Sequence, residues 1–418
     1  MMDRREFMAL AAAGVTMGPG LFAAEEAGIG RAYPGWKPGE MDLHFIHTGR
    51  GENCFYILPD GTTILSDTGD YFRPEEMPEI PWMPKGKDEL LGGDIVVRYI
   101  RRLVKTRTLD YALVSHWHSD HTGAPELRTK AAADGRKVCG LALVGETFDF
   151  GRFYDHQFPK VGQYGGGDVE GRRMIRDWVA AKKIPQEPFR PGALNQLKLM
   201  HDPAGTYCNV FSIRNICANA VCWTGKGEET FDYGAVHAKA TGREFILNQN
   251  TLSMGFVIRY GKFSYFTGGD VSYFLTGADG KTFNYEAVVG KAVGPVTVCK
   301  TNHHAYKDAM TEEFVREVRA QAYVTCVWAP SHIQDCNMRW MSSRELYPGE
   351  RTSFVTQVPD RARKSWPDAA WWKDVAPGGH IVVKVAPGGG SYRIYVLESA
   401  DESMRVKTVV SRETEVQS

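Results

Sequence analysis

The spacing of apolar and polar positions changes several times along this chain. Residues 41–70 form short apolar runs separated by a glycine-rich turn and a Pro-Asp-Gly turn, which predicts three strands. Apolar residues then recur at every fourth position from Leu91 to Leu103, which predicts an amphipathic helix. Residues 109–115 and 140–145 are short apolar runs, and each predicts a buried strand. Strands that alternate with helices place the first half of the chain in the α/β class.

A long irregular stretch precedes a second regular region. Residues 253–270 predict a hairpin that turns at 260–262, and residues 380–399 predict another. Between these hairpins we expect a strand, a helix and a strand at 296–300, 311–321 and 322–328. The pattern loosens at about 147–243, where we expect a long insertion on the scaffold. The charged segment 403–418 is expected to be a peripheral tail.

Composition narrows the class of protein. The 418 residues can bury a sizeable core, and 43% hydrophobic with 24% charged residues is typical of a globular protein. Lys+Arg and Asp+Glu each count 50, whereas a chain that grips long nucleic acids usually carries a basic excess. The sequence therefore carries no strong nucleic-acid signature. None of the 8 cysteines forms a Cys-x-x-Cys pair, which argues against a zinc ribbon or a thioredoxin-type site.

The N-terminus has the layout of an export signal. Arg4 and Arg5 precede Phe7 and a weakly apolar run, an arrangement that resembles the twin-arginine type. We expect residues 1–24 to be a signal peptide that binds the twin-arginine export machinery transiently and is cleaved. The apolar run is too short for a transmembrane anchor, so the mature chain is expected to be periplasmic.

One short loop gathers most of the candidate chemistry. His116, His118, Asp120 and His121 follow the apolar run at 109–115 directly. His116 and His118 are two residues apart and can project to the same side, while Asp120 and His121 point elsewhere. Imidazoles with a carboxylate suit zinc, and manganese or iron are alternatives. The spacing therefore predicts a metal site in which one loop serves two adjacent ions.

This His-x-His-x-Asp-His spacing resembles the signature of the metallo-β-lactamase superfamily. Further segments resemble its motifs in the same order: a strand end at Asp67, a segment that ends at Asp270, and a strand followed by two histidines. The resemblance implies an α+β fold, a four-layer αβ/βα sandwich over residues 38–402, with the long insertion between its two halves. The metal ions would lie at one edge between these halves.

Two details are most similar to the DNA-uptake, ComEC-type hydrolase domains and their stand-alone relatives. These domains open with a Gly-x-Gly-Asp hairpin, which corresponds to 47–53 here, and they end with a His-His pair, here His303 and His304. The chain departs from that pattern at Glu52, which replaces the aspartate, and after the His-His pair, where Ala-Tyr replaces Gly-Ser.

The resemblance also implies how the ligands divide between two divalent ions, with zinc as the first choice. The first ion would be held by His116, His118 and Asp270, and the second by Asp120, His121, Asp270 and His304. Zinc hydrolases of the β-lactamase type have another histidine between the two halves. The equivalent segment here carries Asn250 and Ser253 and no histidine. The third ligand of the first ion is therefore an open question.

The remaining candidate residues receive roles around these ions. Asp120 would orient the nucleophile or accept its proton, and His303, if His304 is the ligand, would donate to an oxyanion or leaving group. Asp67 would hold an imidazole from behind. The side chains expected to line a substrate pocket are Asn250, Ser253 and His332.

These expectations describe a binuclear hydrolase. Two ions about 3.5–4 Å apart can hold a hydroxide that attacks the substrate. We expect phosphodiester or ester cleavage of a small-molecule or envelope-derived substrate. Two alternatives stay open: a metal-stabilised binding module without catalysis, and a hydrolase of β-lactams or lactones.

Overall fold

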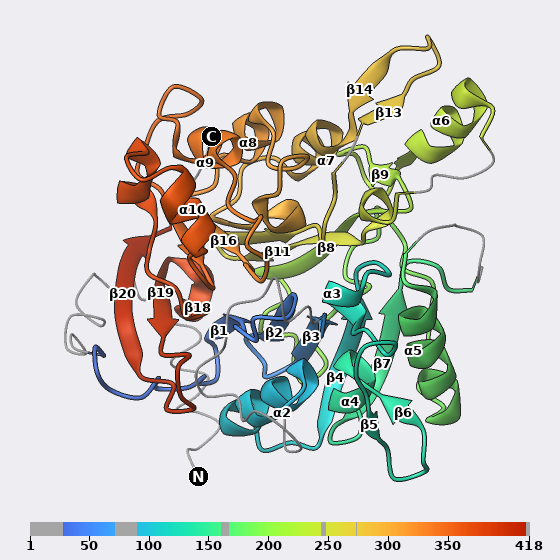
Figure 1. Cartoon of the computed structure of the whole chain (residues 1–418), viewed down its shortest axis with the longest axis vertical. Helices are drawn as coiled ribbons and strands as arrows, with labels where there is room; N and C mark the ends of the chain where they lie inside the picture. The colour runs from blue at the N-terminus through green and yellow to red at the C-terminus, as the bar shows by residue number, and fades with distance from the viewer. Residues whose placement is uncertain (1–27, 72–89, 160–166, 244–247, 273, 415–418) are drawn as a thin grey trace.

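The structure is a computed structural model that describes residues 28–71, 90–159, 167–243, 248–272 and 274–414. The signal peptide expected at residues 1–24 lies outside this range. Two eight-stranded sheets, called here the first and the second sheet, form the centre of the fold (Figure 1).

The first sheet has the strand order β20-β19-β18-β1-β2-β3-β4-β7. Its neighbours are antiparallel except at β3-β4 and β4-β7, which are parallel. The strands are β1 (Met41–Phe45), β2 (Asn53–Ile57), β3 (Thr63–Thr68), β4 (Thr108–Val114), β7 (Asp149–Asp155), β18 (His380–Val385), β19 (Ser391–Leu397) and β20 (Val406–Glu413).

The second sheet has the order β10-β9-β8-β11-β12-β15-β16-β17, and it is parallel from β12 to β17. Its strands are β8 (Phe211–Ala218), β9 (Val221–Trp223), β10 (Thr230–Asp232), β11 (Gly255–Tyr260), β12 (Phe263–Thr267), β15 (Val298–Lys300), β16 (Ala322–Thr325) and β17 (Thr352–Val355). Two small ribbons pair β5 (Lys130–Ala131) with β6 (Lys137–Val138) and β13 (Phe274–Thr276) with β14 (Thr282–Asn284).

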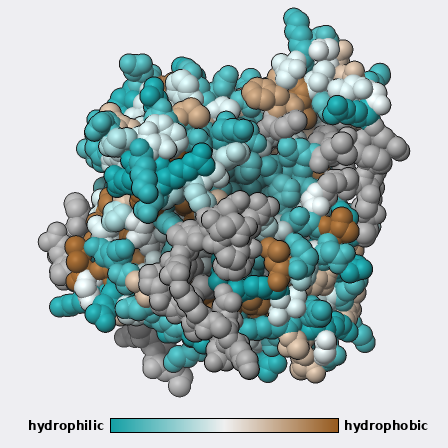
Figure 2. Space-filling view, viewed as in Figure 1, coloured by the Kyte–Doolittle hydropathy of each residue, from teal (hydrophilic) through white to brown (hydrophobic). Residues whose placement is uncertain are grey.

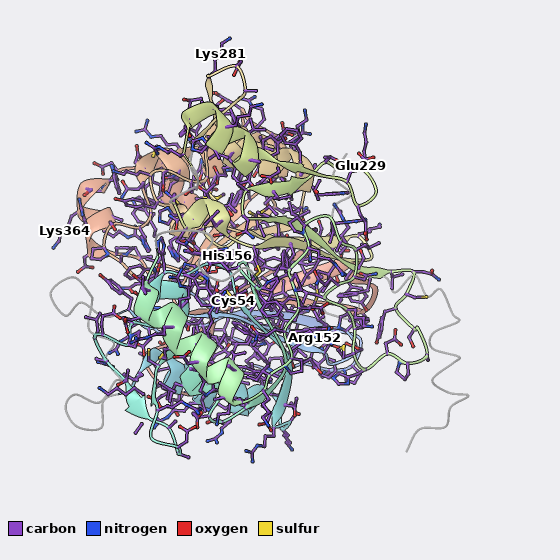
Figure 3. The ribbon with its side chains drawn as sticks, turned by 90° about the vertical axis from the view of Figure 1, so that its right-hand side faces the viewer. Cys54, Arg152, His156, Glu229, Lys281 and Lys364 are labelled. Atoms are coloured by element: carbon purple, nitrogen blue, oxygen red, sulfur yellow. The ribbon has the colours of Figure 1, made fainter. Side chains whose placement is uncertain are left out.

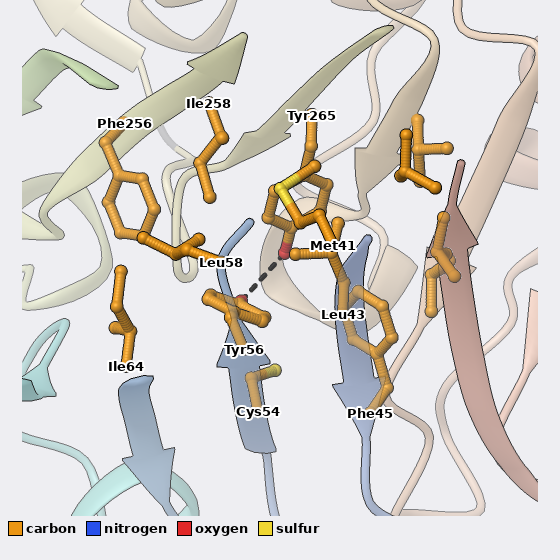
Figure 4. Close-up of a cluster of buried hydrophobic side chains, with 14 of the residues drawn as sticks. Met41, Leu43, Phe45, Cys54, Tyr56, Leu58, Ile64, Phe256, Ile258 and Tyr265 are labelled. Atoms are coloured by element: carbon orange, nitrogen blue, oxygen red, sulfur yellow. Dashed lines mark hydrogen bonds between the residues drawn. The ribbon is translucent and has the colours of Figure 1, made fainter. Parts of the chain in front are cut away.

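Side chains that alternate along each strand separate the core into layers. On β4, Tyr111 and Leu113 join the cluster between the sheets, whereas Ala112 and Val114 join the cluster on the outer face. Figure 4 shows the inner cluster, where the hydroxyls of Tyr56 and Tyr265 lie 2.8 Å apart. Because both faces of each sheet are apolar, each sheet needs a cover on its outer side.

Helices supply these covers. The outer face of the first sheet packs against α2 (Gly92–Leu103), α4 (Gly140–Val144) and α5 (Val169–Ala181). The second sheet packs against α7 (Tyr285–Val293), α8 (Glu312–Val318), α9 (Asp335–Ser342) and α10 (Asp360–Ser365). The predicted four-layer αβ/βα sandwich is therefore confirmed. The other helices within the described residues are α3 (Ser119–Thr122), α6 (Tyr233–Thr241), η3 (Asn250–Leu252), η4 (Asn302–Ala305), η5 (Ala370–Asp374) and η6 (Pro387–Gly389).

The surface is mostly polar, in contrast to the apolar interior. In the side view of Figure 3, Cys54 lies deep in the molecule, while Glu229, Lys281 and Lys364 project outward. The face shown in Figure 2 is mostly hydrophilic, with scattered apolar residues. Within the described part of the chain, no helix combines the length and apolar composition that a membrane crossing needs.

Several sequence predictions compare directly with these elements. The helix expected at 91–103 is α2, and the two predicted hairpins are β11-β12 and β18-β19. The strand predicted at 140–145 is wrong, because this segment is the helix α4. A six-residue apolar run carries too little periodicity to separate a buried strand from a buried helical turn.

Two other segments contribute more to the sheets than we expected. The stretch 147–243, expected to be an insertion, contains β7 of the first sheet and β8 of the second sheet. The C-terminal segment 403–418, expected to be a tail, contains β20, an edge strand paired with β19. The charged residues of β20 fit an edge strand, since one face and one side of it meet solvent.

Candidate metal centre

The candidate site lies where loops leave neighbouring strands of the two sheets. The loop that begins at Ser115 follows β4, and the loop that carries Asp270 follows β12. The turn that carries His303 and His304 follows β15, the parallel neighbour of β12. Carboxyl ends of adjacent parallel strands meet at one edge of a sheet, so these loops come together there.

The carboxylate of Asp270 is the centre of the cluster. Its Oδ2 lies 3.2 Å from Nε2 of His121, 3.4 Å from Nε2 of His304 and 3.8 Å from Nε2 of His116. Oδ2 of Asp120 lies 3.0 Å from Nε2 of His304 and 3.6 Å from Nε2 of His121. Residues from three loops thus direct nitrogen and oxygen donors at one small volume.

Hydrogen bonds from behind fix the orientation of each ring. Nδ1 of His121 donates to Asp67, at a distance of 3.0 Å, and Nδ1 of His304 donates to the carbonyl of Cys326, at 2.8 Å. Nδ1 of His116 lies 3.1 Å from the hydroxyl of Ser115. Because Nδ1 is occupied in all three rings, Nε2 is the nitrogen that faces Asp270. The predicted supporting residue Asp67 thus contacts the ring of His121 on the side away from Asp270.

The residues present fit a divalent cation. Among the described side chains, Oδ1 of Asp270 is buried without a hydrogen-bond partner, and Oδ2 faces only the Nε2 atoms of the neighbouring imidazoles. Buried polar atoms normally have partners, so a cation bound here would satisfy Oδ1 and replace the ring protons that face Oδ2. The donors are imidazole nitrogens and carboxylate oxygens, the set that zinc accepts and that manganese and iron tolerate.

The pKa shifts in the cluster also favour a bound cation. Burial alone would raise the pKa of Asp270, but His121 and His304 beside it hold that pKa well below its usual range. Burial would lower the pKa of His304, yet the carboxylates of Asp270 and Asp120 raise it to about 10. The two carboxylates therefore stabilise positive charge in this volume, and a bound cation would supply that charge instead of the ring protons.

The pair formed by His116 and His118 adjoins this volume. Nε2 of His116 lies 3.1 Å from Nδ1 of His118. Burial, with His121 next to it, lowers the pKa of His116 well below its ordinary value, which keeps this ring neutral and able to bind a metal. His116 is fully buried and His118 partly exposed, so the pair connects the interior of the site to its rim.

The two consecutive histidines occupy different positions. Nε2 of His304 lies between the two carboxylates, whereas Nε2 of His303 is 4.0 Å from Asp270 and 3.2 Å from the amide nitrogen of Asn250. Nδ1 of His303 lies 2.6 Å from Asp308. Both histidines have positive φ, +42° and +51°, a strained backbone that turns successive rings toward the same site.

The three pocket candidates take up different positions. Asn250 contacts His303 at the rim, as described above. Ser253 is fully buried, and its hydroxyl accepts a hydrogen bond from the backbone N–H of Asp270, so it supports the loop that carries Asp270. His332 stacks on His304 with ring centroids 4.7 Å apart and is 5% exposed.

Sequence reasoning assigned no role to three residues beside the cluster, Asp308, Lys300 and Glu52. Asp308 contacts His303, and Lys300 forms a buried ion pair with Glu52, with Nζ and Oε2 2.6 Å apart. The only signal for Lys300 was a charged residue at the end of an apolar run. Glu52 drew attention as a departure from the hairpin motif, without a partner.

Glu52 could itself be counted among the ligands, since donor atoms of Glu52, His121, Asp270 and His304 lie within 4.8 Å of one another. Its Oε2 is, however, engaged by Lys300 and lies 3.8 Å from Nδ1 of His304, the nitrogen that faces away from Asp270. The Glu52 carboxylate therefore lies on the far side of the His304 ring from Asp270, and we do not count it among the candidate ligands.

Comparisons with known proteins give likenesses to solved structures alone. No family model matches the chain, and no curated protein sequence matches it. A provisionally assigned metal-dependent hydrolase from Parabacteroides distasonis ATCC 8503 aligns over 68% of this chain and 80% of its own, with 10% identity and a TM-score of 0.28.

A protein of unknown function from Enterococcus faecalis V583 aligns over 77% of this chain and 71% of its own, with 9% identity and a TM-score of 0.30. Zn²⁺-bound PqqB from Methylobacterium extorquens aligns over 81% of this chain and 98% of its own, with 9% identity and a TM-score of 0.35. All three scores are low, so the fold stated above rests on the strand order and layers of this chain.

Proposed function

We propose that this chain is a metal-dependent hydrolase with two divalent cations, zinc as the first choice, at the cluster around Asp270. The observation that carries the proposal is the convergence of three imidazoles and the carboxylates of Asp120 and Asp270 on one volume, with His118 beside His116 at its edge. Bound there, the ions would supply an activated water and Lewis acidity toward a carbonyl or phosphoryl oxygen.

The division of ligands follows the ring positions. His116, His118 and Asp270 would hold one ion. Asp120, His121, Asp270 and His304 would hold the other. Asp67 keeps the ring of His121 in the tautomer that leaves Nε2 free.

Two partly exposed side chains can handle protons during the reaction. The side chain of Asp120 is 13% exposed, and its carboxylate can accept a proton from the attacking water. His303 is 20% exposed and is held by Asp308, so its ring can donate a hydrogen bond to a developing oxyanion or a proton to a leaving group.

We further propose phosphodiesters or esters as substrates. The glycine-rich hairpin and the His303-His304 pair resemble those of ComEC-type hydrolase domains, which favours phosphodiesters. The balanced charge of the chain favours a small or envelope-derived molecule over long DNA. The export-type N-terminus favours action in the periplasm.

The test uses purified chain lacking residues 1–24, loaded with zinc or manganese. We expect hydrolysis of bis-p-nitrophenyl phosphate or of a p-nitrophenyl ester, and loss of that hydrolysis in His116→Ala. Cleavage of a chromogenic cephalosporin alone would shift the assignment to β-lactams. A metal-loaded chain that cleaves none of these compounds contradicts the hydrolase.

The pair His116 and His118 also favours a second candidate, a binding module that uses one metal for stability. Of the carboxylates described around this pair, that of Asp270 lies 3.8 Å from Nε2 of His116, and the sequence offers no third histidine for this ion. Metal analysis separates the two functions. Two equivalents with turnover support the hydrolase, and one equivalent without turnover supports the module.

A further inference from the structure

Beneath the candidate metal centre lies an ion pair that the proposed chemistry does not use. Lys300 ends β15, and its side chain is 1% exposed. Its ammonium group donates to Oε2 of Glu52 at 2.6 Å, to the carbonyl of Gly269 at 2.9 Å and to the carbonyl of Thr301 at 2.9 Å. An ammonium group has three donors, so all of them are used.

The acceptors of Lys300 belong to the loops that carry the ligands. The carbonyl of Gly269 is part of the peptide that leads into Asp270. The carbonyl of Thr301 opens the turn that presents His304. Lys300 therefore ties together two loops of the second sheet, each one residue or a few residues from a ligand.

Glu52 connects this lysine to the first sheet. The backbone N–H of Glu52 donates to the carbonyl of Asp120 at 2.7 Å, and its carbonyl accepts from the N–H of Gly69 at 2.9 Å. Its side chain is 2% exposed and ends on Lys300. One residue thus joins the Asp120 loop, through its backbone, to the Asp270 and His304 loops, through its side chain.

We propose that Glu52 and Lys300 are positioning residues, a staple between the two sheets that sets the separation of the Asp120 and Asp270 carboxylates for metal binding. A buried ion pair adds little net stability compared with apolar side chains of the same volume. The pair contacts all three loops that carry the proposed ligands, so its role is to position these loops rather than to stabilise the fold. This inference rests on the proposed metal centre.

The test compares zinc binding by calorimetry in folded variants. Lys300→Met leaves Glu52 buried without its partner, so it destabilises the fold as well. The double variant Glu52→Gln with Lys300→Met leaves no unpaired buried charge, so it loses less stability than Lys300→Met alone. We expect this double variant to stay folded, to unfold at a higher temperature than Lys300→Met, and to bind zinc about tenfold to a hundredfold more weakly than the wild type.

Lys384→Met is the matched control. Lys384 is also buried, and it pairs with Asp42 at 3.2 Å and with Glu40, away from the centre. We expect it to lose stability while its zinc affinity stays at the wild-type value. Glu52→Gln alone, which keeps an acceptor for Lys300, is expected to fall between the wild type and the double variant.

The outcomes separate this inference from the proposed function. A folded double variant that binds zinc as tightly as the wild type overturns the staple, whatever the activity. A wild type that binds zinc but cleaves nothing overturns the hydrolase and leaves the staple supported if the double variant binds weakly. A wild type without zinc binding overturns both.

Discussion

At the scale of single residues, the chemistry of the centre depends on which ring nitrogen faces inward and what holds the other. His304 and His303 are adjacent in sequence, yet one ring donates to a backbone carbonyl and the other to a carboxylate. The bond to the carbonyl places Nε2 of His304 between Asp120 and Asp270. The bond to the carboxylate holds the His303 ring at the rim of the site, where it can contact a substrate.

This difference predicts opposite effects for two alanine variants. His304→Ala should lose about one equivalent of bound zinc, because Nε2 of His304 is a ligand in the proposed centre. His303→Ala should keep its zinc and lose roughly 100-fold in kcat, the usual contribution of a proton donor. Metal analysis and steady-state kinetics check both. Loss of metal in His303→Ala with retention in His304→Ala would reverse the two roles.

At the scale of elements, the tip of the β1-β2 hairpin and the end of β3 pack tightly against the Asp120 loop. A Cβ on Gly69 would lie 1.9 Å from the carbonyl oxygen of Asp120 and 2.8 Å from Cα of Gly51. Both obstacles are backbone atoms, which cannot swing away as a side chain can. The glycines of this region therefore allow the contact through which Glu52 reaches Asp120.

Gly69→Ala is accordingly expected to destabilise the fold by about 1–3 kcal/mol, the cost of overpacking, and to weaken zinc binding. Gly390→Ala is the control, because its Cβ would meet nothing within 4 Å and its φ is −77°. Thermal unfolding and zinc calorimetry measure the two effects. If the two variants were equally stable, the Asp120 loop would be able to move away from Gly69, and the tight contact would not matter for stability.

At the scale of the whole molecule, a buried network far from the metal centre couples stability to pH. Asp42 on β1 accepts from the hydroxyl of Tyr33 at 2.6 Å and from Lys384 on β18 at 3.2 Å. Burial outweighs these partners and raises the pKa of Asp42 to about 6. The folded state therefore favours the protonated carboxyl more than the unfolded state does.

The sign of the effect follows from this shift. The stability that Asp42 contributes is complete below about pH 4 and is lost as the pH rises through 6, with a size of about 3 kcal/mol. Asp42→Asn stays neutral throughout. Its stability relative to the wild type should rise between pH 4 and 6 and level off above, measured by urea unfolding of metal-free protein. A difference that does not vary with pH would contradict the raised pKa.

The sequence by itself determined the local features of this protein. The period of four from Leu91 to Leu103 specifies α2, because helix contacts repeat within one turn. The loop from His116 to His121 brings its donors together within six residues. The motif order around Asp67 and Asp270 implied the four-layer sandwich that the sheets confirm. The roles of these residues as metal ligands remain predictions.

Other features depended on contacts between segments distant in sequence. The run at 140–145 buries its apolar side chains against the first sheet as a helix, and β20 pairs with β19 as an edge strand. Only the tertiary structure decided that His304 points inward and that Glu52 meets Lys300, 248 residues away. The physical reason is that burial and pairing belong to the assembled sheets, whereas a sequence pattern records only neighbours within a few residues.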